Sequence, residues 1–200
     1  KQHQEIIPGP DNVLRVFRDT NFDELKVIVV GEEPYNRCKE ENHIANGLAF
    51  ATDIKDYLPP SLQIIFEELK EDTDQNKFEL TDFPMGKFIK MSWGIHQGSQ
   101  GVMLLNTALT VTENKPNSHL KLWQPFTQAL IQKLDDDYGD RLVWLLMGKK
   151  PVALSSYIKQ GTIVTTVNPS PWKRKEFIGS KPFSQVNKIL TTNGYSPIIW

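Results

Sequence analysis

The chain has 200 residues with 23 Lys and Arg against 24 Asp and Glu, a net charge of −1. Hydrophobic residues make up 39% and charged residues 24%, a globular composition that excludes a disordered acidic tail. The length fits one domain, and we expect residues 1–200 to form it. A near-neutral total also argues against a strongly basic nucleic-acid binder.

The charge is unevenly distributed. Residues 141–200 hold nine basic and one acidic side chain, and residues 1–140 hold 14 basic and 23 acidic ones. The two parts therefore carry +8 and −9. Two interpretations remain open, chance clustering on a solvated surface or a basic face that meets an anion.

Four short apolar runs alternate with stretches of helical spacing. In chain order we predict strand Lys26–Val30, helix Ser61–Lys70, strand Val102–Leu105, helix Leu122–Leu134, strand Leu142–Met147, helix Pro151–Lys159, strand Thr162–Val167 and helix Pro182–Leu190. Ser61 follows two prolines and is expected to cap its helix. The order predicts a single α/β domain with a central four-stranded, mostly parallel sheet flanked by helices.

Polar side chains follow the predicted strands. In such sheets ligands bind beyond the carboxyl ends of the strands. Carboxylates, amides and nearby aromatics there suit a flat polar ring, such as a base flipped out of nucleic acid. These side chains are Glu32, Glu33, Tyr35, Phe50, Asn106 and Asn168.

Other chemistries lack support in the sequence. It contains no G-x-x-x-x-G-K-[ST] loop, no G-x-G-x-x-G and no G-x-S-x-G, so we expect no nucleotide cofactor and no serine-hydrolase elbow. Cys38 excludes an internal disulfide and favours a reducing compartment, which we take to be the cytoplasm. Cys38 and His43 are weak indications of a thiol nucleophile. The four histidines are scattered, and with one cysteine they form no metal-ligand pattern.

No apolar run reaches the roughly 20 residues that span a membrane, and no signal peptide is visible. We expect no membrane partner.

Several motifs occur in one order along the chain. They are Gly31–Tyr35 (GEEPY), Gly47–Phe50 (GLAF), Pro59–Leu62 (PPSL), Leu104–Val111 (LLNTALTV), Asn168–Pro171 (NPSP), Phe177–Gly179 (FIG) and Pro197–Trp200 (PIIW). This series resembles the main, highly uracil-specific family of uracil-DNA glycosylases over nearly the whole chain. The resemblance implies a monomeric, cofactor-free hydrolase with an α/β/α fold that excises uracil from single- and double-stranded DNA.

The resemblance assigns the catalytic roles with two departures. Glu33 stands where the family has an Asp that positions water and stabilises the sugar cation, and its extra methylene shifts the oxygens by up to ~1 Å or more. Asn168 replaces the family's His, which donates a hydrogen bond to uracil O2. Loss of such a donor costs about 10²–10³ in rate, so we expect slower but retained activity.

The same resemblance places the base. The backbone of Glu32 is expected to hold the uracil ring, Tyr35 to exclude the thymine methyl, and Phe50 to stack on the ring. The Asn106 amide is expected to read O4 and N3–H, and it mismatches cytosine. The alternatives are a solvent-facing turn for Glu33, plain core for the two aromatics and a strand-end cap for Asn106.

The DNA contacts implied by the resemblance fall in three loops. Ser61 and Ser170 match serines that grip phosphates, and Gly148-Lys149 stands where the family has Gly-Ser. Trp172 occupies the position of the family's Leu wedge; the alternative is an interior Trp. Lys173 and Arg174 follow it and are expected to grip phosphate.

Two further functions stay open beside the enzyme. One is a catalytically weakened glycosylase-like protein that binds uracil-containing or single-stranded DNA, and the other is a glycosylase with shifted base choice. An acidic, DNA-mimicking inhibitor protein is an additional partner implied by the resemblance. Segments 37–45 and 94–100 are longer than the family pattern, and the sequence does not show why.

Overall fold

The computed structural model describes residues 5–73 and 97–200. At its centre is a four-stranded sheet in the order β5-β2-β7-β8, and all three pairings are parallel. This confirms the predicted sheet. The strands are β2 (Val27–Gly31), β5 (Val102–Asn106), β7 (Val143–Met147) and β8 (Thr162–Thr166).

The strands differ in burial according to their place in the sheet. Every residue of β2, β5 and β7 is buried, as continuous apolar runs require when helices cover both faces. The edge strand β8 is fully buried only at Val164, and Thr162 and Thr165 are exposed to solvent. The core therefore centres on the first three strands.

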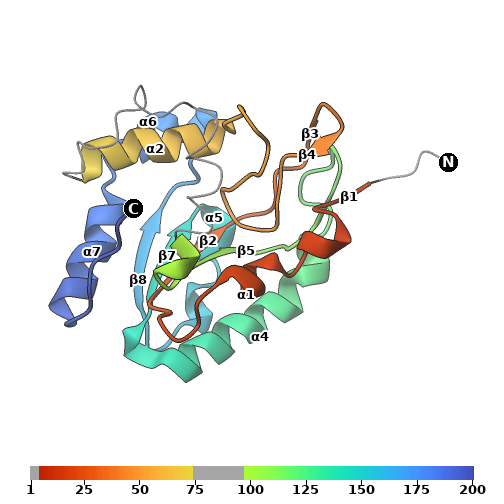
Figure 1. Ribbon diagram of the computed structural model, residues 1–200. Helices are drawn as coiled ribbons and strands as arrows, with labels where there is room; N and C mark the ends of the chain where they lie inside the picture. Colours follow the sequence, from red (N-terminus) through yellow and green to blue (C-terminus); the bar gives the residue numbers. More distant parts are fainter. Residues whose placement is uncertain (1–4, 74–96) are drawn as a thin grey trace.

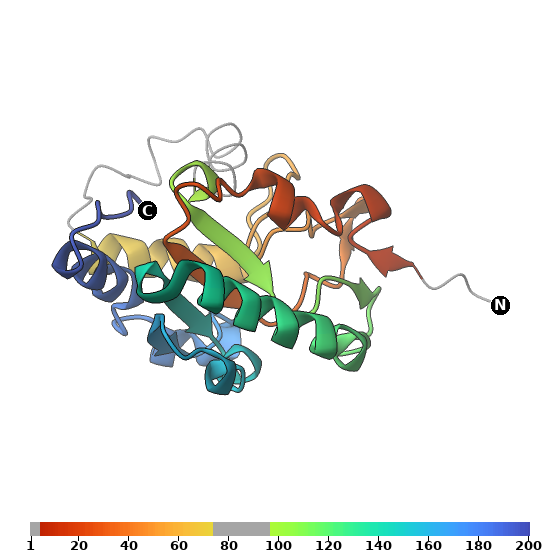
Figure 2. The ribbon, with the colours of Figure 1, turned by 90° about the horizontal axis from the view of Figure 1, so that it is seen from below.

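Helices cover both faces of the sheet. Figure 2 shows α4 running across one face, with α2 and α7 on the other side. The α-helices are α1 (Arg15–Asp19), α2 (Pro60–Asp72), α4 (Leu120–Tyr138), α5 (Lys149–Val152), α6 (Arg174–Phe177) and α7 (Pro182–Thr192). Short 3-10 turns are η1 (Pro10–Asn12), η2 (Gly139–Arg141), η3 (Ser155–Tyr157) and η4 (Pro171–Lys173). Within residues 5–73 and 97–200, no helix is long and apolar enough to cross a membrane.

Three helix predictions need correction. Ser61 does not cap α2, because Pro59 occupies the N-cap and the helix begins at Pro60. The predicted helix Pro151–Lys159 is only α5 followed by a 3-10 turn. The α-helical pattern stops because the backbone N–H groups of residues 154, 157 and 158 bond carbonyls three residues earlier. The carboxylate of Asp135 then accepts the N–H groups of residues 159–161, just ahead of β8.

The third correction concerns α4. It runs from Leu120 to Tyr138, beyond the predicted Leu122–Leu134, and contains Pro125. Phe126 is 42% exposed, whereas the neighbouring Thr127 is buried. The hydroxyl of Thr127 donates a hydrogen bond to the carbonyl of Thr107 at 2.8 Å, so this buried polar group is satisfied.

Two small sheets lie at the end of the molecule near the N-terminus (Figure 1). In one, β1 (Ile6–Ile7) pairs with β6 (Val111–Thr112). In the other, β3 (Cys38–Lys39) and β4 (Asn42–His43) form a hairpin, so the longer segment 37–45 is a hairpin that lies near β1. The other long segment, 94–100, lies partly outside the described residues. His3 and His96 also lie outside them.

Candidate active site

The carboxyl ends of the four central strands lie along one edge of the sheet. Gly31 pairs with Asn106 at the ends of β2 and β5, and Met147 pairs with Thr166 at the ends of β7 and β8. Parallel α/β sheets bind ligands beyond this edge. The segments that carry the predicted site residues therefore begin side by side.

Gly31 is the point where two predicted base-binding side chains meet. A Cβ atom at Gly31 would lie 2.8 Å from Oδ1 of Asn106 and 3.1 Å from two ring carbons of Phe50. Asn106 is only 5% exposed, so its amide is buried at the carboxyl end of β5. Phe50 has a φ of 57°, a left-handed conformation that residues other than glycine adopt rarely. The Asn106 amide and the Phe50 ring thus both lie against the backbone of Gly31, which has no side chain.

Gly148 has the same place at the end of β7. A Cβ atom there would lie 2.7 Å from Oε1 of Glu32 and 3.2 Å from Cβ of Asn168. Its φ of 110° also favours glycine. Oε2 of Glu32 pairs with Nζ of Lys150 at 3.1 Å. Because Glu32 directly follows Gly31, the contacts around the two glycines form one continuous surface.

Glu33 is half-buried beside this surface. Its Oε2 accepts a hydrogen bond from the backbone N–H of Asn117 at 2.8 Å. Burial raises the pKa of the Glu33 carboxyl above its ordinary value, and neither the bond from Asn117 nor the charge of Lys150 offsets the effect of burial. A carboxyl with a raised pKa at a strand edge is suited to acid–base chemistry.

The sequence did not predict the support around Glu33. The ammonium of Lys150 donates a hydrogen bond to Oδ1 of Asn117 and forms an ion pair with Glu32. Asn117 was not singled out at all. Its signal is the Pro116-Asn117-Ser118 turn ahead of α4, where a φ of 67° suits asparagine. The two residues hold both carboxylates of the Glu32-Glu33 pair.

Tyr35 lies beside the two small sheets. Its ring packs against the buried cluster of Ile7, Ala45 and Val111. The hydroxyl is buried and has no hydrogen-bond partner among the described residues. Burial raises the pKa of this hydroxyl far above its ordinary value, so the phenol is neutral at physiological pH. The ring is therefore a fixed apolar surface rather than an ionising group.

The predicted DNA-binding residues lie at element ends. Ser61 is the second residue of α2, Lys149 is the first of α5, and Ser170 precedes η4. Trp172 is 94% exposed. That value excludes the interior Trp that the sequence left open, and it places a large apolar surface in solvent.

Two of the predicted phosphate-gripping cations already have partners. Nζ of Lys173 lies 2.6 Å from Oε1 of Glu176, and Nε of Arg174 lies 2.8 Å from Oε2 of Glu67 on α2. Exposed pairs of this kind contribute about 0–1 kcal/mol, so phosphates can replace the glutamates at little cost. The net +8 of residues 141–200 nevertheless overstates the positive field on this face.

The comparisons with known proteins identify the family of the chain. A family model described as the uracil DNA glycosylase superfamily matches residues 17–191. The chain belongs to the uracil-DNA glycosylase superfamily. It is 36% identical to a uracil-DNA glycosylase of Leuconostoc citreum, covering 100% of this chain and 84% of that relative. It is 37% identical to a Campylobacter lari uracil-DNA glycosylase, covering 98% and 80%.

Solved glycosylase structures share the fold. The crystal structure of mimivirus uracil-DNA glycosylase superposes with a TM-score of 0.84 at 24% identity and covers 98% of this chain and 75% of that one. A variant of the mimivirus protein, solved in complex with UGI, gives the same TM-score. The predicted α/β architecture is confirmed. The roles of individual side chains remain predictions.

Proposed function

We propose that this glycosylase hydrolyses the N-glycosidic bond of deoxyuridine in single- and double-stranded DNA, releasing uracil and leaving an abasic site. Membership of the superfamily and the names of the relatives support the reaction. The observation that carries the site is the convergence of Asn106 and Phe50 on Gly31, one residue before Glu32 and two before Glu33.

Glu33 and Asn168 divide the chemistry between them. Cleavage leaves positive charge on the sugar and negative charge on the base. The carboxylate of Glu33 positions water and stabilises the sugar cation, while the Asn168 amide donates to uracil O2 as charge accumulates there. A longer acid and a shorter donor both change geometry, and a displacement of about 1 Å can slow a reaction about 10²-fold. We therefore propose activity below that of family members with Asp and His.

Base choice follows from two side chains of fixed position. The Asn106 amide offers one donor and one acceptor to uracil, and cytosine leaves those buried groups unpaired at about 1–3 kcal/mol each. Tyr35 sterically excludes the thymine methyl, and its packed ring gives it little room to retreat. The structure therefore supports uracil over both normal pyrimidines.

DNA would lie across the loops that carry Ser61, Gly148-Lys149 and Ser170. Exposed Trp172 would enter the duplex where the base leaves. An acidic inhibitor protein that mimics DNA is proposed to bind the same face; the mimivirus variant in complex with UGI is the structural precedent. We also propose that the protein acts as a monomer in the cytoplasm.

Matched oligonucleotides test the proposal. Single- and double-stranded DNA carrying U or T is incubated with wild type, Glu33→Gln and Glu24→Gln, and alkali then cleaves abasic sites. Glu24 is an exposed carboxylate at the opposite edge of the sheet and serves as the control. We expect uracil release by wild type and Glu24→Gln, and a loss of about 10²–10⁴-fold in Glu33→Gln.

Each alternative has its own outcome. No uracil release at high enzyme concentration, with DNA binding retained, would identify the catalytically weakened binding protein instead. Rapid thymine release would contradict the role of Tyr35. Equal rates in wild type and Glu33→Gln would remove Glu33 from the mechanism.

A further inference from the structure

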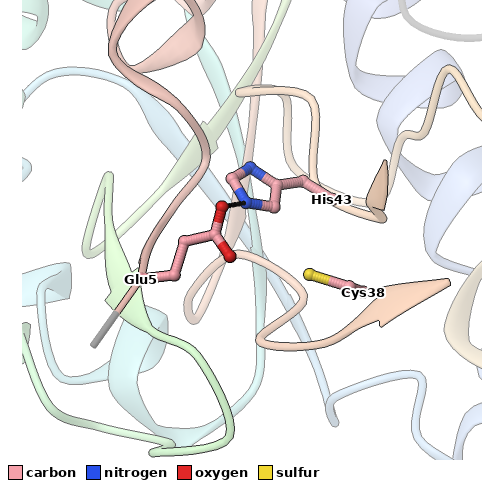
Figure 3. A group of neighbouring side chains, drawn as sticks. All are labelled: Glu5, Cys38 and His43. Atoms are coloured by element: carbon pink, nitrogen blue, oxygen red, sulfur yellow. Dashed lines mark hydrogen bonds and ion pairs between the residues drawn. The ribbon is translucent and has the colours of Figure 1, made fainter. Parts of the chain in front are cut away.

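A cluster of three side chains lies away from the strand-end site, beside the N-terminal strand. Glu5, Cys38 and His43 each offer one ligand atom, and these atoms lie within 4.8 Å of one another. Figure 3 shows the three side chains pointing toward a common space, with Nε2 of His43 2.8 Å from Oε1 of Glu5. We propose that this cluster binds one Zn²⁺ ion as a structural site.

The backbone fixes two of the ligands. Cys38 and His43 are paired directly across the β3–β4 hairpin. Opposite residues of an antiparallel pair project to the same face with Cβ atoms about 4.5–5.5 Å apart. The loop of Glu40 and Glu41 has positive φ at both residues, which is the tight two-residue turn that sets this register.

The third ligand comes from a separate part of the chain. Glu5 directly precedes β1, which pairs with β6, and its carbonyl accepts a hydrogen bond from the N–H of Glu113 at 2.9 Å. The carboxylate of Glu113 is also in hydrogen-bonding contact with the Cys38 thiol. Glu113 is thus a nearby candidate for the fourth position, with water as the alternative.

The donor set suits zinc. A thiolate sulfur, an imidazole nitrogen and carboxylate oxygens are the usual Zn²⁺ ligands, at about 2.0–2.3 Å from the metal. Those bond lengths place tetrahedral ligand atoms about 3–4 Å apart, a spacing that the cluster can reach with small side-chain movements because its ligand atoms all lie within 4.8 Å of one another. Calcium and magnesium prefer oxygen ligands throughout, and a cysteine does not serve them.

A thiol nucleophile is the competing interpretation of the same three residues, and the surroundings of Cys38 oppose it. Nucleophilic cysteines have a lowered pKa. Here burial, followed by the hydrogen bond with Glu113 and the charges of Glu113 and Glu5, raises the pKa of the thiol to about 11. A bound cation would reverse the effect of these carboxylates, because it neutralises them and deprotonates the coordinating thiol.

The cluster is accessible to a metal ion. A cavity of about 620 Å³ opens beside it, and Glu5 and His43 line one side. Glu40, Glu41 and Asp53 also line this cavity. Their negative charges would attract cations toward the ligands.

The site would fix the hairpin to the N-terminal strand. Cys38 packs against the same buried cluster of Ile7, Ala45 and Val111 that supports Tyr35. A metal here would therefore stabilise the packing of this cluster, including the position of Tyr35. This inference does not depend on the proposed enzymatic activity.

Metal titration of the full chain tests the site. Reduced, metal-free protein is titrated with Zn²⁺, and with Co²⁺ as a spectroscopic probe. We expect one ion per chain, a thiolate-to-cobalt charge-transfer band, and a Tm rise of about 5–10 °C at a hundredfold excess over Kd. Cys38→Ser and His43→Asn should each weaken Zn²⁺ binding at least about 100-fold. Glu41→Gln removes a carboxylate from the same cavity but not from the cluster, and should bind zinc nearly normally.

Two results would overturn the proposal. One is the absence of stoichiometric binding at micromolar zinc. The other is equal binding by wild type, Cys38→Ser and His43→Asn. If a variant fails to fold, the wild type decides alone, because bound Zn²⁺ should protect Cys38 from alkylation by iodoacetamide; unprotected alkylation at saturating Zn²⁺ contradicts the site.

Discussion

The two ends of the central strands, called here the carboxyl edge and the amino edge of the sheet, each hold a carboxyl group that is at least half-buried. The surroundings of these two groups have opposite effects on their charge. At the carboxyl edge, Glu33 accepts a hydrogen bond from the backbone N–H of Asn117, and burial raises the pKa of its carboxyl. At the amino edge, Asp135 accepts the N–H groups of residues 159–161 and the indole N–H of Trp144. Burial acts on the Asp135 carboxyl as well, but these donors outweigh it and lower the pKa. One carboxyl is thus left available for chemistry, and the other is committed to the fold.

Glycine marks the same division. Gly31 leaves room for Asn106 and Phe50 at the carboxyl edge. At the amino edge, a Cβ on Gly161 would lie 2.5 Å from Nε1 of Trp144 and 3.0 Å from Oδ1 of Asp135. The first glycine makes space for a ligand-binding surface, and the second permits a closed hydrogen-bond network. Close packing against a glycine therefore does not by itself mark a functional site.

Gly31→Ala is expected to lower activity more than any other variant that leaves the Glu33 carboxyl in place. The added methyl group must displace the Asn106 amide or the Phe50 ring, and a shift of about 1 Å lowers the rate about 10²-fold. Single-turnover uracil release measures it. Gly9→Ala is the matched control, because a Cβ there meets nothing closer than 4.0 Å. Equal rates in the two variants would show that the carboxyl edge tolerates displacement and is not the base-binding surface.

Asp135→Asn tests the other edge. An asparagine amide turns one acceptor into a donor that faces backbone N–H groups, so we expect a loss of about 1–3 kcal/mol in the free energy of unfolding. Uracil release by the folded variant should be unchanged. Denaturant unfolding measures the difference, with exposed Asp136→Asn as the control on the same helix. A variant that kept its stability but lost activity would break the proposed division between the edges.

The same variant has a defined pH signature. A carboxyl whose pKa is lower in the folded state contributes stability above its unfolded pKa of about 3.9 and loses that contribution as the pH falls through the folded value. Wild type should therefore lose this stabilisation in the acid range, and Asp135→Asn should lack that part of the pH dependence. Parallel curves for the two proteins would contradict the role of the charge.

Trp172→Ala is expected to act on DNA alone. The side chain is 94% exposed, so its removal should leave Tm nearly unchanged. Stacking on bases contributes about 1–3 kcal/mol per base, which predicts roughly tenfold weaker binding of uracil-containing DNA. Fluorescence anisotropy measures the Kd, and Trp172→Leu should restore part of the affinity. A large fall in Tm would show that the exposed indole supports the fold instead.

The sequence predicted the carboxyl edge better than the amino edge. Residues such as Asn106 directly follow apolar runs, and the parallel topology brings such positions together. Asp135 carried no comparable signal, because its partners are backbone groups 24–26 residues away in the chain. A helical pattern alone cannot show that an aspartate such as Asp135 will be buried.

The sequence also missed contacts that depend on three-dimensional pairing. The hydrogen bond to Glu33 comes from the backbone of Asn117, a position that no motif marks. The Glu5–Cys38–His43 cluster requires the β3–β4 register and the position of β1, and neither follows from composition. The scattered histidines gave no spacing motif, and spacing alone could not reveal a cluster assembled across two small sheets.

The pH profile of uracil release gives the smallest and most direct test of the contrast between Glu33 and Asp135. If the ionised carboxylate is required, the rate should fall as the pH drops through the raised pKa of Glu33, so the acid limb should lie above the ordinary glutamate value of about 4.3. Lys150→Met removes a positive charge that lowers this pKa, and should move the limb to higher pH. Lys150→Arg should leave it near the wild-type position.

The pH dependence of stability should have opposite signs for Glu33 and Asp135. A raised carboxyl pKa in the folded state means that the contribution of Glu33 to stability is present below its unfolded pKa and is lost as the pH rises through the folded value. Glu33→Gln should therefore be at least as stable as wild type at pH 7 while it releases uracil slowly, whereas Asp135→Asn should be less stable and release uracil normally. An acid limb at or below pH 4.3, or a Glu33→Gln variant less stable than wild type, would contradict this assignment. Either result would mean that the folded protein stabilises the charged form of Glu33, as it does for the structural carboxylate of Asp135.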